Sequence, residues 1–592
     1  MSFRAPVRDI QFSLDEVAGF GDLIGSRRFA DLDRDTVAAV LEAAGQLADQ
    51  VLSPINRQGD LAGARYANGA VTAAPGFRDA YKAFARGGWI GLSADLELGG
   101  QGLPKALEQA AFECFHAANM AFTLCPMLTL AGIEALQAHG TERQKRLYAT
   151  RLVSGEWTGA MVLTEPQSGS DLSTLRATAT PLGDGTYRLT GQKIYITWGD
   201  HDCADNIVHF VLARLPDAPA GTRGISLFLA SKFLADDEGR LGARNSFRPV
   251  GMEHKLGIHG SPTCVMAYEE AIAELIGEPN QGLAHMFTMM NAARLAVGVE
   301  GVGIAQRAFA QAYDYANERR QGRSAWTQEA SAPIFDQPDV RRMLAVSKAR
   351  IEAARGLCLS TAVAGDLARG DDPEGYWKRR EDLLVPVAKA WATDVGVEVA
   401  STALQVHGGM GFIEETGAAQ HYRDARIAPI YEGTNGIQAI DLVGRKLAMT
   451  QGQSVTELVD DVRRTIEALH RSGDPRMAQV AASLATASDC LVRATAWLLQ
   501  LEVAAQGAKL CGAAGYLRLL GDVTGGWMLA KGAQAAARRL DAGDGDPAWL
   551  RGKISLAQVF AANVLAQADG LLAQVTQGED ALRALDRDAL AA

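Results

Sequence analysis

The chain has 592 residues, of which 48% are hydrophobic and 21% are charged, and its formal net charge is −11. This length can bury several cores, so three or four domains are expected. The acidic balance disfavours nucleic acid and anionic membranes as main partners, although it is compatible with a local basic pocket for a phosphorylated ligand.

Cysteine usage and chain ends indicate the compartment. Seven dispersed cysteines without a Cys-x-x-Cys pair predict reduced thiols. The N-terminal segment lacks the apolar core of a signal peptide, the last residues form no peroxisomal signal, and no uninterrupted apolar stretch has the length of a membrane span. We therefore expect a cytoplasmic protein without a membrane span. His254 and His259 flank a loop-like glycine, and no spacing in the chain predicts a metal site.

The predicted elements change type along the chain, which indicates a mainly helical α+β fold. After an N-terminal arm (1–34), apolar residues recur at helical spacing over 35–158. The pattern becomes strand-like over 159–278, where Gly183-Asp184-Gly185 predicts a hairpin turn. Helical patterns return over 279–449. The three long helices of this part are expected at about 282–320, 338–368 and 383–407.

A short linker at 450–453 precedes a further helical block, residues 454–592. Ser454 and Glu457 have the spacing of a capping box, and Val455, Leu458 and Val462 begin an apolar stripe. These helices could bury that stripe against one another. Because the linker is short, we expect the block to pack against the preceding helices instead.

The segment Pro429-Ile430-Tyr431-Glu432-Gly433-Thr434 places one carboxylate between an aromatic residue and a Gly-Thr turn. A partly desolvated acid has a raised pKa and can act as a base near neutral pH. Taken alone, such a stretch is more often a loop with a capping acid. Upstream, however, lie Gln405-Val406-His407-Gly408-Gly409 and then Arg423-Asp424-Ala425-Arg426.

Two segments of the β-rich part suit a flavin, which needs donors, an aromatic or apolar wall and close backbone contact. They are Met161-Val162-Leu163-Thr164-Glu165-Pro166-Gln167-Ser168-Gly169-Ser170-Asp171 and Gly191-Gln192-Lys193-Ile194-Tyr195-Ile196-Thr197-Trp198-Gly199. Each segment alone would be read as an ordinary serine-rich turn or amphipathic strand. Together, and in this order before the Glu432 turn, they resemble the two β-domain flavin motifs of the acyl-CoA dehydrogenase family.

With these motifs in this order, the chain resembles the acyl-CoA dehydrogenase family over about residues 35–446. The arm and the last block resemble its longer members, among them 3-methylmercaptopropionyl-CoA dehydrogenases. The resemblance implies a helical domain, a β-domain and a helical bundle, FAD as cofactor and an acyl-CoA as substrate. It also implies an electron-transfer flavoprotein as partner and a homodimer or larger homo-oligomer.

The resemblance also implies roles for single residues. Glu432 would be the general base, and Arg294, in Met290-Asn291-Ala292-Ala293-Arg294, would contact CoA or support the active site. Tyr195 stands where the family usually has Trp, and Trp198 where it often has Asn or Ser. The implied FAD contacts are Met161, Leu163, Thr164, Gly169, Ser170, Tyr195, Thr197 and Thr434, with Arg319, Gln405 and Gly409 reaching the FAD of a neighbouring subunit.

The implied reaction is α,β-dehydrogenation of an acyl-CoA thioester to a trans-2-enoyl-CoA, in which Glu432 removes the α-proton and the β-hydride passes to flavin N5. An acyl-CoA oxidase that uses oxygen is one alternative, and a non-catalytic helical scaffold is another. The pattern Gly298-x-x-Gly301-x-Gly303 faintly resembles a dinucleotide-binding loop. Because no strand precedes it, we predict close helix packing there instead.

Overall fold

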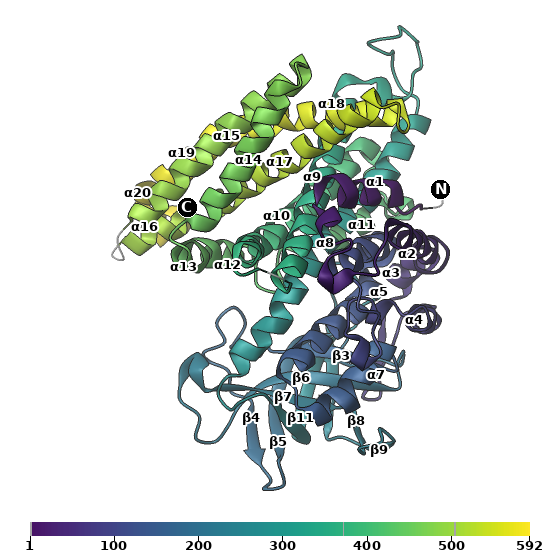
Figure 1. The fold of residues 1–592 in the computed structure, drawn as a ribbon. Coiled ribbons are helices and arrows are strands. Elements are labelled where there is room, and N and C mark those ends of the chain that lie inside the picture. The colour runs from purple at the N-terminus through teal and green to yellow at the C-terminus, as the bar shows by residue number, and fades with distance from the viewer. Residues whose placement is uncertain (1–2, 371, 502–504, 592) are drawn as a thin grey trace.

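The computed structural model describes residues 3–370, 372–501 and 505–591. Figure 1 shows N-terminal helices in purple, a β-domain below them, a bundle of long teal helices, and a layer of green-to-yellow helices beside that bundle. The expected mainly helical α+β fold with an additional C-terminal helical block is therefore confirmed.

The first part of the chain is helical. In the N-terminal arm, α1 (Val7–Phe12) and the π-helical turn η1 (Ser13–Val17) bury Ile10, Phe12 and Leu14. The elements that follow are α2 (Arg34–Leu47), α3 (Ser53–Ala62), a hairpin of β1 (Arg65–Ala67) and β2 (Ala70–Thr72), α4 (Phe77–Arg86), α5 (Lys105–His139), α6 (Glu142–Gln144) and α7 (Thr150–Ser154).

Two stretches of the described chain are long and apolar enough to cross a membrane by length and composition alone. In α5 the most apolar window is 94% buried inside the protein, which is typical of a core helix. The second stretch, Pro547–Gln577, has a window that is 39% buried. A 3-10 turn divides it into α18 (Pro547–Asn563) and α19 (Ala568–Gln577), and both helices pack against neighbouring helices of the C-terminal block.

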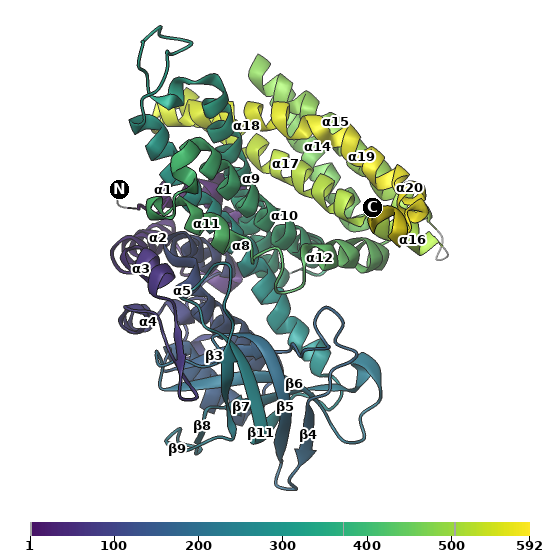
Figure 2. The same cartoon turned by 180° about the vertical axis from the view of Figure 1, so that it is seen from behind.

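The β-domain contains one large sheet whose strands close on themselves. β5 pairs with β4 and β11, β6 pairs with β3, β4 and β7, and β7 pairs in turn with β11 (Figure 2). The predicted hairpin around Gly183-Asp184-Gly185 is the antiparallel pair β4–β5. The strands of this sheet are β3 (Trp157–Val162), β4 (Thr178–Pro181), β5 (Thr186–Thr197), β6 (Asn206–Arg214), β7 (Ile225–Ser231), β10 (Phe247–Met252) and β11 (Thr263–Ile276). A separate two-stranded sheet consists of β8 (Phe233–Ala235) and β9 (Leu241–Arg244).

Three long helices, α8 (Gly282–Glu318), α9 (Pro338–Ala368) and α10 (Tyr376–His407), form the bundle. α8 and α10 approach each other closely. A Cβ added at Gly298 would lie 2.7 Å from the carbonyl oxygen of Ala388, and one at Gly301 would lie 2.6 Å from that of Ala392. The glycine pattern thus serves close helix packing, as predicted. Residue numbers rise in the same direction along both helices at these contacts, so α8 and α10 are parallel.

α10 begins at Tyr376, about two turns before the start predicted at 383. The additional turns include Lys378-Arg379-Arg380-Glu381-Asp382, a charged run without apolar periodicity. These charges are bound by partners distant in sequence. Arg380 donates to Asp461 at 2.7 Å, and Arg379 donates to Glu457 at 2.5 Å.

Beyond α10 the bundle ends in short elements. They are η10 (Gly408–Phe412), η11 (Glu414–Thr416), α11 (Ala418–Ala425), α12 (Asn435–Asp441), η12 (Leu442–Lys446) and α13 (Leu447–Met449). The C-terminal block then consists of α14 (Gln453–Arg471), α15 (Pro475–Gln500), α16 (Gln506–Cys511), α17 (Ala513–Asp541), α18, α19, α20 (Glu579–Ala584) and α21 (Arg587–Ala591).

The C-terminal block packs against the bundle, as expected from the apolar stripe. Trp391 of α10 donates its indole N–H to Asp522 of α17 at 2.9 Å, and Lys553 of α18 donates to Glu352 of α9 at 2.9 Å. The predicted capping box is wrong. Gly452 caps α14 without a side-chain bond, and Glu457 instead faces Arg379, because the docking contact takes the carboxylate away from the helix end.

Candidate active site

Glu432 lies in the turn between α11 and α12, and the backbone there is strained. Glu432 has a φ of 55° and Gly433 a φ of 81°. Thr434 caps α12, since its hydroxyl oxygen accepts the N–H of Ile437 at 3.1 Å. Gln438 donates to the carbonyl oxygens of Glu432 and Gly433, each at 3.4 Å. A non-glycine residue holds such a conformation only where its surroundings fix it, which is typical of functional turns.

The carboxyl group of Glu432 faces two basic side chains. Burial raises the pKa of Glu432, and the charges of Arg294 and Lys389 limit that rise. The guanidinium of Arg294 comes from α8, and its Nη2 lies 3.8 Å from the position that a Cβ on Gly433 would take. Among the described residues, the backbone N–H of Glu432 has no hydrogen-bond acceptor. The structure thus brings together Arg294, a carboxyl group with a raised pKa and a free N–H donor.

Lys389 and Asn435 support the turn from behind. Lys389 of α10 is fully buried and donates to the Asn435 side-chain oxygen at 2.9 Å. The Asn435 amide donates in turn to Asp394 at 2.7 Å and to the Ala390 carbonyl at 3.0 Å. Burial lowers the pKa of Lys389 to about 8, although Glu432, Asp394 and Glu300 act in the opposite direction. The start of α12 is therefore fixed to α10 through one side chain.

A second carboxyl group lies on the other side of the turn. The Tyr431 hydroxyl donates to Oε1 of Glu300 in the middle of α8, and Glu300 is fully buried. Sequence reasoning missed Glu300. The available signal was a single acid within the otherwise apolar run from Leu295 to Ile304.

The two predicted flavin segments come together in the β-domain. Met161 lies in β3, Leu163 and Thr164 follow it, and Tyr195 and Thr197 end β5. The backbone N–H of Ile194 donates to the Thr164 carbonyl at 2.9 Å. Tyr195 has a φ of 60° and is 61% exposed, which leaves its ring free at the surface of the chain.

A buried ion pair connects these two segments to each other. Lys193 of β5 donates to the Leu163 carbonyl at 2.9 Å and to Glu165 at 2.9 Å, and both side chains are buried. Glu165 also accepts the N–H groups of Arg176 and Ala177, at 2.8 and 3.0 Å. Sequence reasoning missed this pair as well, because it connects residues in separate motifs.

The other predicted flavin residues lie apart from these. Gly169 and Ser170 occupy an exposed loop after β3, and a Cβ on Gly169 would meet nothing within 4 Å. Arg319, Gln405 and Gly409 are exposed at the shared C-terminal end of α8 and α10, where Tyr315 and His407 stack at 4.6 Å. At 1.5 Å per helical residue, Arg319 lies about 37 Å along α8 from Arg294.

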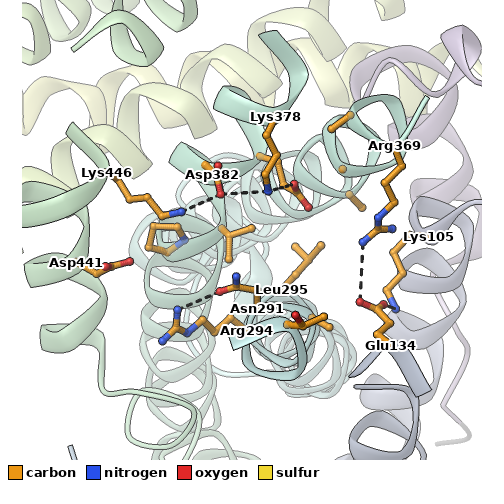
Figure 3. A pocket seen from close by; sticks show the side chains of 18 residues that line it. Lys105, Glu134, Asn291, Arg294, Leu295, Arg369, Lys378, Asp382, Asp441 and Lys446 are labelled. Carbon is orange, nitrogen blue, oxygen red and sulfur yellow. Dashed lines mark hydrogen bonds and ion pairs between the residues drawn. The ribbon is translucent and has the colours of Figure 1, made fainter. Parts of the chain in front are cut away.

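A pocket of about 300 Å³ lies beside Arg294, between α5, α8, α9 and α10 (Figure 3). Figure 3 shows Arg294 next to Asn291, Lys378 and Lys446 on either side of Asp382, and Lys105 and Arg369 at Glu134. The lining contains five basic residues (Lys105, Arg294, Arg369, Lys378, Lys446) and four acidic ones (Glu134, Glu381, Asp382, Asp441). Apolar side chains such as Leu295, Val385 and Pro386 complete the lining, and the one excess basic residue is compatible with a phosphorylated ligand.

Comparison with known proteins decides the family. A 3-methylmercaptopropionyl-CoA dehydrogenase of Ruegeria pomeroyi is 42% identical over 585 residues, which are 98% of this chain and 99% of that protein. The chain belongs to the acyl-CoA dehydrogenase family. A broad-specificity linear acyl-CoA dehydrogenase of Mycobacterium tuberculosis is 32% identical over 99% of this chain and 98% of that protein.

Family profiles and a solved structure agree with this assignment. The N-terminal, middle and C-terminal domains of acyl-CoA dehydrogenases match residues 35–156, 160–271 and 280–448, and a profile described as acetyl-CoA dehydrogenase C-terminal like matches 458–586. The fold is that of an acyl-CoA dehydrogenase from Bacillus anthracis complexed with FAD, at 21% identity and a TM-score of 0.74, over 100% of this chain and 94% of that one.

The expected class is thereby confirmed. The protein is a long member of the acyl-CoA dehydrogenase family, a flavoprotein oxidoreductase that dehydrogenates acyl-CoA. The non-catalytic scaffold is left without support. The roles of the individual site residues stay predictions.

Proposed function

We propose that this acyl-CoA dehydrogenase converts an acyl-CoA thioester to the trans-2-enoyl-CoA with Glu432 as the general base. The observation that carries the proposal is the Glu432 turn itself. It combines a carboxyl group of raised pKa, a strained backbone and the neighbouring Arg294. A base with a pKa closer to neutrality removes a weakly acidic α-proton more effectively.

The chain supplies two groups for the reacting end of the substrate. The Glu432 carboxylate takes the proton from the α-carbon, and the free N–H of Glu432 donates to the thioester carbonyl oxygen as negative charge develops there. The positive charge of Arg294 favours the ionised form of this carboxyl group. When bound, FAD supplies the acceptor for the two electrons that leave the β-carbon.

The residues of the β-domain fit FAD. Thr164 and Thr197 offer half-buried hydroxyl groups, Tyr195 offers an exposed aromatic wall, and the loop at Gly169 leaves room for close approach. We infer that these residues hold FAD together with Met161, Leu163, Ser170 and Thr434. Arg319, Gln405 and Gly409 would contact the FAD of a neighbouring subunit in a homodimer or larger homo-oligomer.

We further propose that the pocket beside Arg294 receives the CoA part of the substrate. The pocket has one more basic than acidic side chain, and Arg294 lies both in its wall and beside Glu432. A substrate reaching from this pocket to the turn would pass Arg294. We expect a cytoplasmic enzyme that passes its electrons to an electron-transfer flavoprotein.

Anaerobic bleaching of the flavin against a panel of acyl-CoAs tests this function. We expect reduction of the wild-type flavin by at least one acyl-CoA, and none in Glu432→Gln. Failure of every acyl-CoA to bleach a flavin-loaded enzyme would contradict the proposal. Oxygen consumption with the best substrate distinguishes an oxidase from a dehydrogenase that needs an electron-transfer flavoprotein.

A further inference from the structure

Glu300 is a buried carboxyl group for which the reaction described above has no role. It is 0% exposed, and its Oε1 accepts the hydroxyl of Tyr431, the residue next to the base. Its Oε2 has no hydrogen-bond partner among the described residues. Burying an ionised carboxylate with one oxygen unpaired is costly, whereas a neutral carboxyl group can be tolerated there.

The groups that face Glu300 decide its charge. Tyr431 and Glu432 face it from the turn, Asp424 from α11, and Lys389 from α10. Burial raises the pKa of Glu300 to about 8, with Glu432 and Asp424 acting in the same direction and with Tyr431 and Lys389 opposing them. At neutral pH the side chain is therefore mainly protonated.

We propose that Glu300 is a positioning residue for the catalytic base: as a neutral carboxyl group it anchors Tyr431 and thereby fixes the strained turn from which Glu432 projects. The proposal rests on the assignment of Glu432 as the base. It explains how the positive φ of Glu432 is held from two sides, by Tyr431–Glu300 and by Asn435–Lys389. A neutral Glu300 also adds no second negative charge beside Glu432.

Ionisation of Glu300 would oppose the reaction. A second negative charge beside Glu432 disfavours the negative charge that develops on the thioester oxygen. Lys389, whose pKa is also about 8, loses its positive charge over the same range. The rate should therefore fall on the alkaline side through two ionisations, one of which belongs to Glu300.

Three variants of the FAD-loaded enzyme test the proposal. Glu300→Gln keeps an acceptor for Tyr431 without a titrating group, so kcat at pH 7 should stay within about twofold and the alkaline decline should become shallower. Glu300→Met removes the acceptor and should lower kcat by up to about 10²-fold, the scale of a small misplacement of reacting groups. Tyr431→Phe should lower kcat similarly and shift the alkaline decline to higher pH, because the Tyr431 bond lowers the pKa of Glu300.

Infrared difference spectra of wild type against Glu300→Gln provide a direct readout. We expect a protonated carboxyl band at pH 7 that disappears with a midpoint near pH 8. Asp522→Asn is the matched control. Asp522 of α17, in the C-terminal block, is also a buried carboxyl group that accepts a hydrogen bond from an aromatic residue, Trp391 of α10. It should change neither the band nor the alkaline decline.

Two results would overturn the proposal. Loss of turnover in Glu300→Gln as complete as in Glu432→Gln would make Glu300 a catalytic base rather than a positioning residue. The absence of the protonated band, or a normal kcat and pH profile in both Glu300→Met and Tyr431→Phe, would remove its role. Normal turnover in Glu432→Gln would instead refute the assignment of the base itself.

Discussion

Three non-glycine residues with positive φ, Tyr195, Trp198 and Glu432, lie in the segments that we assign to flavin and substrate. Each such conformation costs on the order of 1–3 kcal/mol and persists only where neighbours fix it. Trp198 is fixed by burial and by its stacking with Phe77 at 6.3 Å. Glu432 is fixed by bonds from Gln438 and through Tyr431. Three of the nine such residues in the described chain thus lie where reacting groups must be placed accurately.

Replacing Glu432 by Gln should leave FAD bound and lower kcat by at least about 10²-fold, because the proposed general base is lost while the shape of the turn is kept. Stopped-flow flavin reduction and the flavin content of the purified protein measure the two effects. Glu415→Gln, at an exposed glutamate of η11, is the control and should behave as wild type. Near-normal reduction by Glu432→Gln would place the base elsewhere.

Replacing Lys193 by Met should lower the FAD content of the purified protein, because the two flavin segments lose the side chain that joins them. Glu165 would be left buried without its cation, which costs about 3–5 kcal/mol of stability. Arg188→Met is the matched control in the same strand, since its partner Glu270 and Arg188 itself are both exposed. Full flavin content with an unchanged absorbance spectrum in Lys193→Met would show that the pair does not position the site.

At the residue scale, the sequence predicted what lies within a motif. The Glu432 turn and the two flavin segments were recognisable because their chemistry is continuous along the chain. Glu300 and Lys389 were not recognisable as parts of the site, because each is a single charge in a helix. Their contacts with Tyr431 and Asn435 arise only from the packing of α8 and α10 around the turn.

At the scale of elements, α10 joins the pocket to the C-terminal block. Its first turns direct Lys378 and Asp382 into the pocket, while Arg379 and Arg380 reach α14. The predicted start of this helix was wrong because its charges are satisfied by distant partners rather than by solvent. The helices of the bundle and the β4–β5 hairpin were predictable, since periodicity and turn chemistry are local signals.

Replacing Asp461 by Asn should raise the KM for acyl-CoA by roughly 3- to 10-fold, with a smaller effect on kcat. The reason is that Arg380 and Tyr376 both bond to this carboxylate and fix the α10 wall of the pocket. Asp460→Asn is the neighbouring control, because Asp460 is exposed and pairs with Arg463 of its own helix. A KM in Asp461→Asn equal to that of the control and of the wild type would show that α14 does not support the pocket.

At the scale of the whole molecule, the exposed group of Arg319, Gln405 and Gly409 predicts an assembly. Arg319→Ala should lower FAD retention in the homo-oligomer, because a cation for the neighbour's pyrophosphate is lost. Sedimentation and flavin absorbance at the same protein concentrations measure both properties. Arg320→Ala is the control, since Arg320 pairs with Glu329 of its own loop. A flavin-loaded and fully active monomer would contradict this prediction.

A buried ion cluster fastens the N-terminal arm, the bundle and the C-terminal block together. Asp9 of α1 bonds Lys348 of α9 at 2.6 Å and Lys553 of α18 at 2.8 Å. Glu352 bonds both lysines and also Arg355, which in turn bonds Glu113 of α5. Burial alone would raise the pKa of Asp9, but the lysines outweigh it and hold that pKa well below its ordinary value.

Replacing Lys553 by Met should destabilise the protein by about 3–5 kcal/mol, because Asp9 and Glu352 lose a shared buried cation. Since the pKa of Asp9 is lowered in the folded state, the stability it contributes is present above about pH 4 and is lost as the pH falls further. Denaturant unfolding at pH 7 and pH 4 measures both effects. Arg551→Met, at an exposed position two residues earlier, should change stability by less than about 0.5 kcal/mol.

The domain boundaries stay a prediction, which limited proteolysis of the wild type tests. In the wild type we expect little cleavage at 450–453, because Gly452 packs against Leu499 and α14 is docked on α10. Release of a folded tail from the wild type, with unchanged core activity, would show that the block is independent.

The ion cluster also determines when the N-terminal arm can finish folding during synthesis. Asp9 and Lys553 are 544 residues apart in the chain, so their contact cannot form until the segment around Lys553 has left the ribosome. Until then Asp9 and Glu352 lack the positive charge of Lys553, and the surface against which the N-terminal arm packs is incomplete. Domains of a growing chain generally fold in sequence from the N-terminus. In this protein α18 completes the burial of α1, and a nascent chain stopped before α18 would leave the site of α1 incomplete.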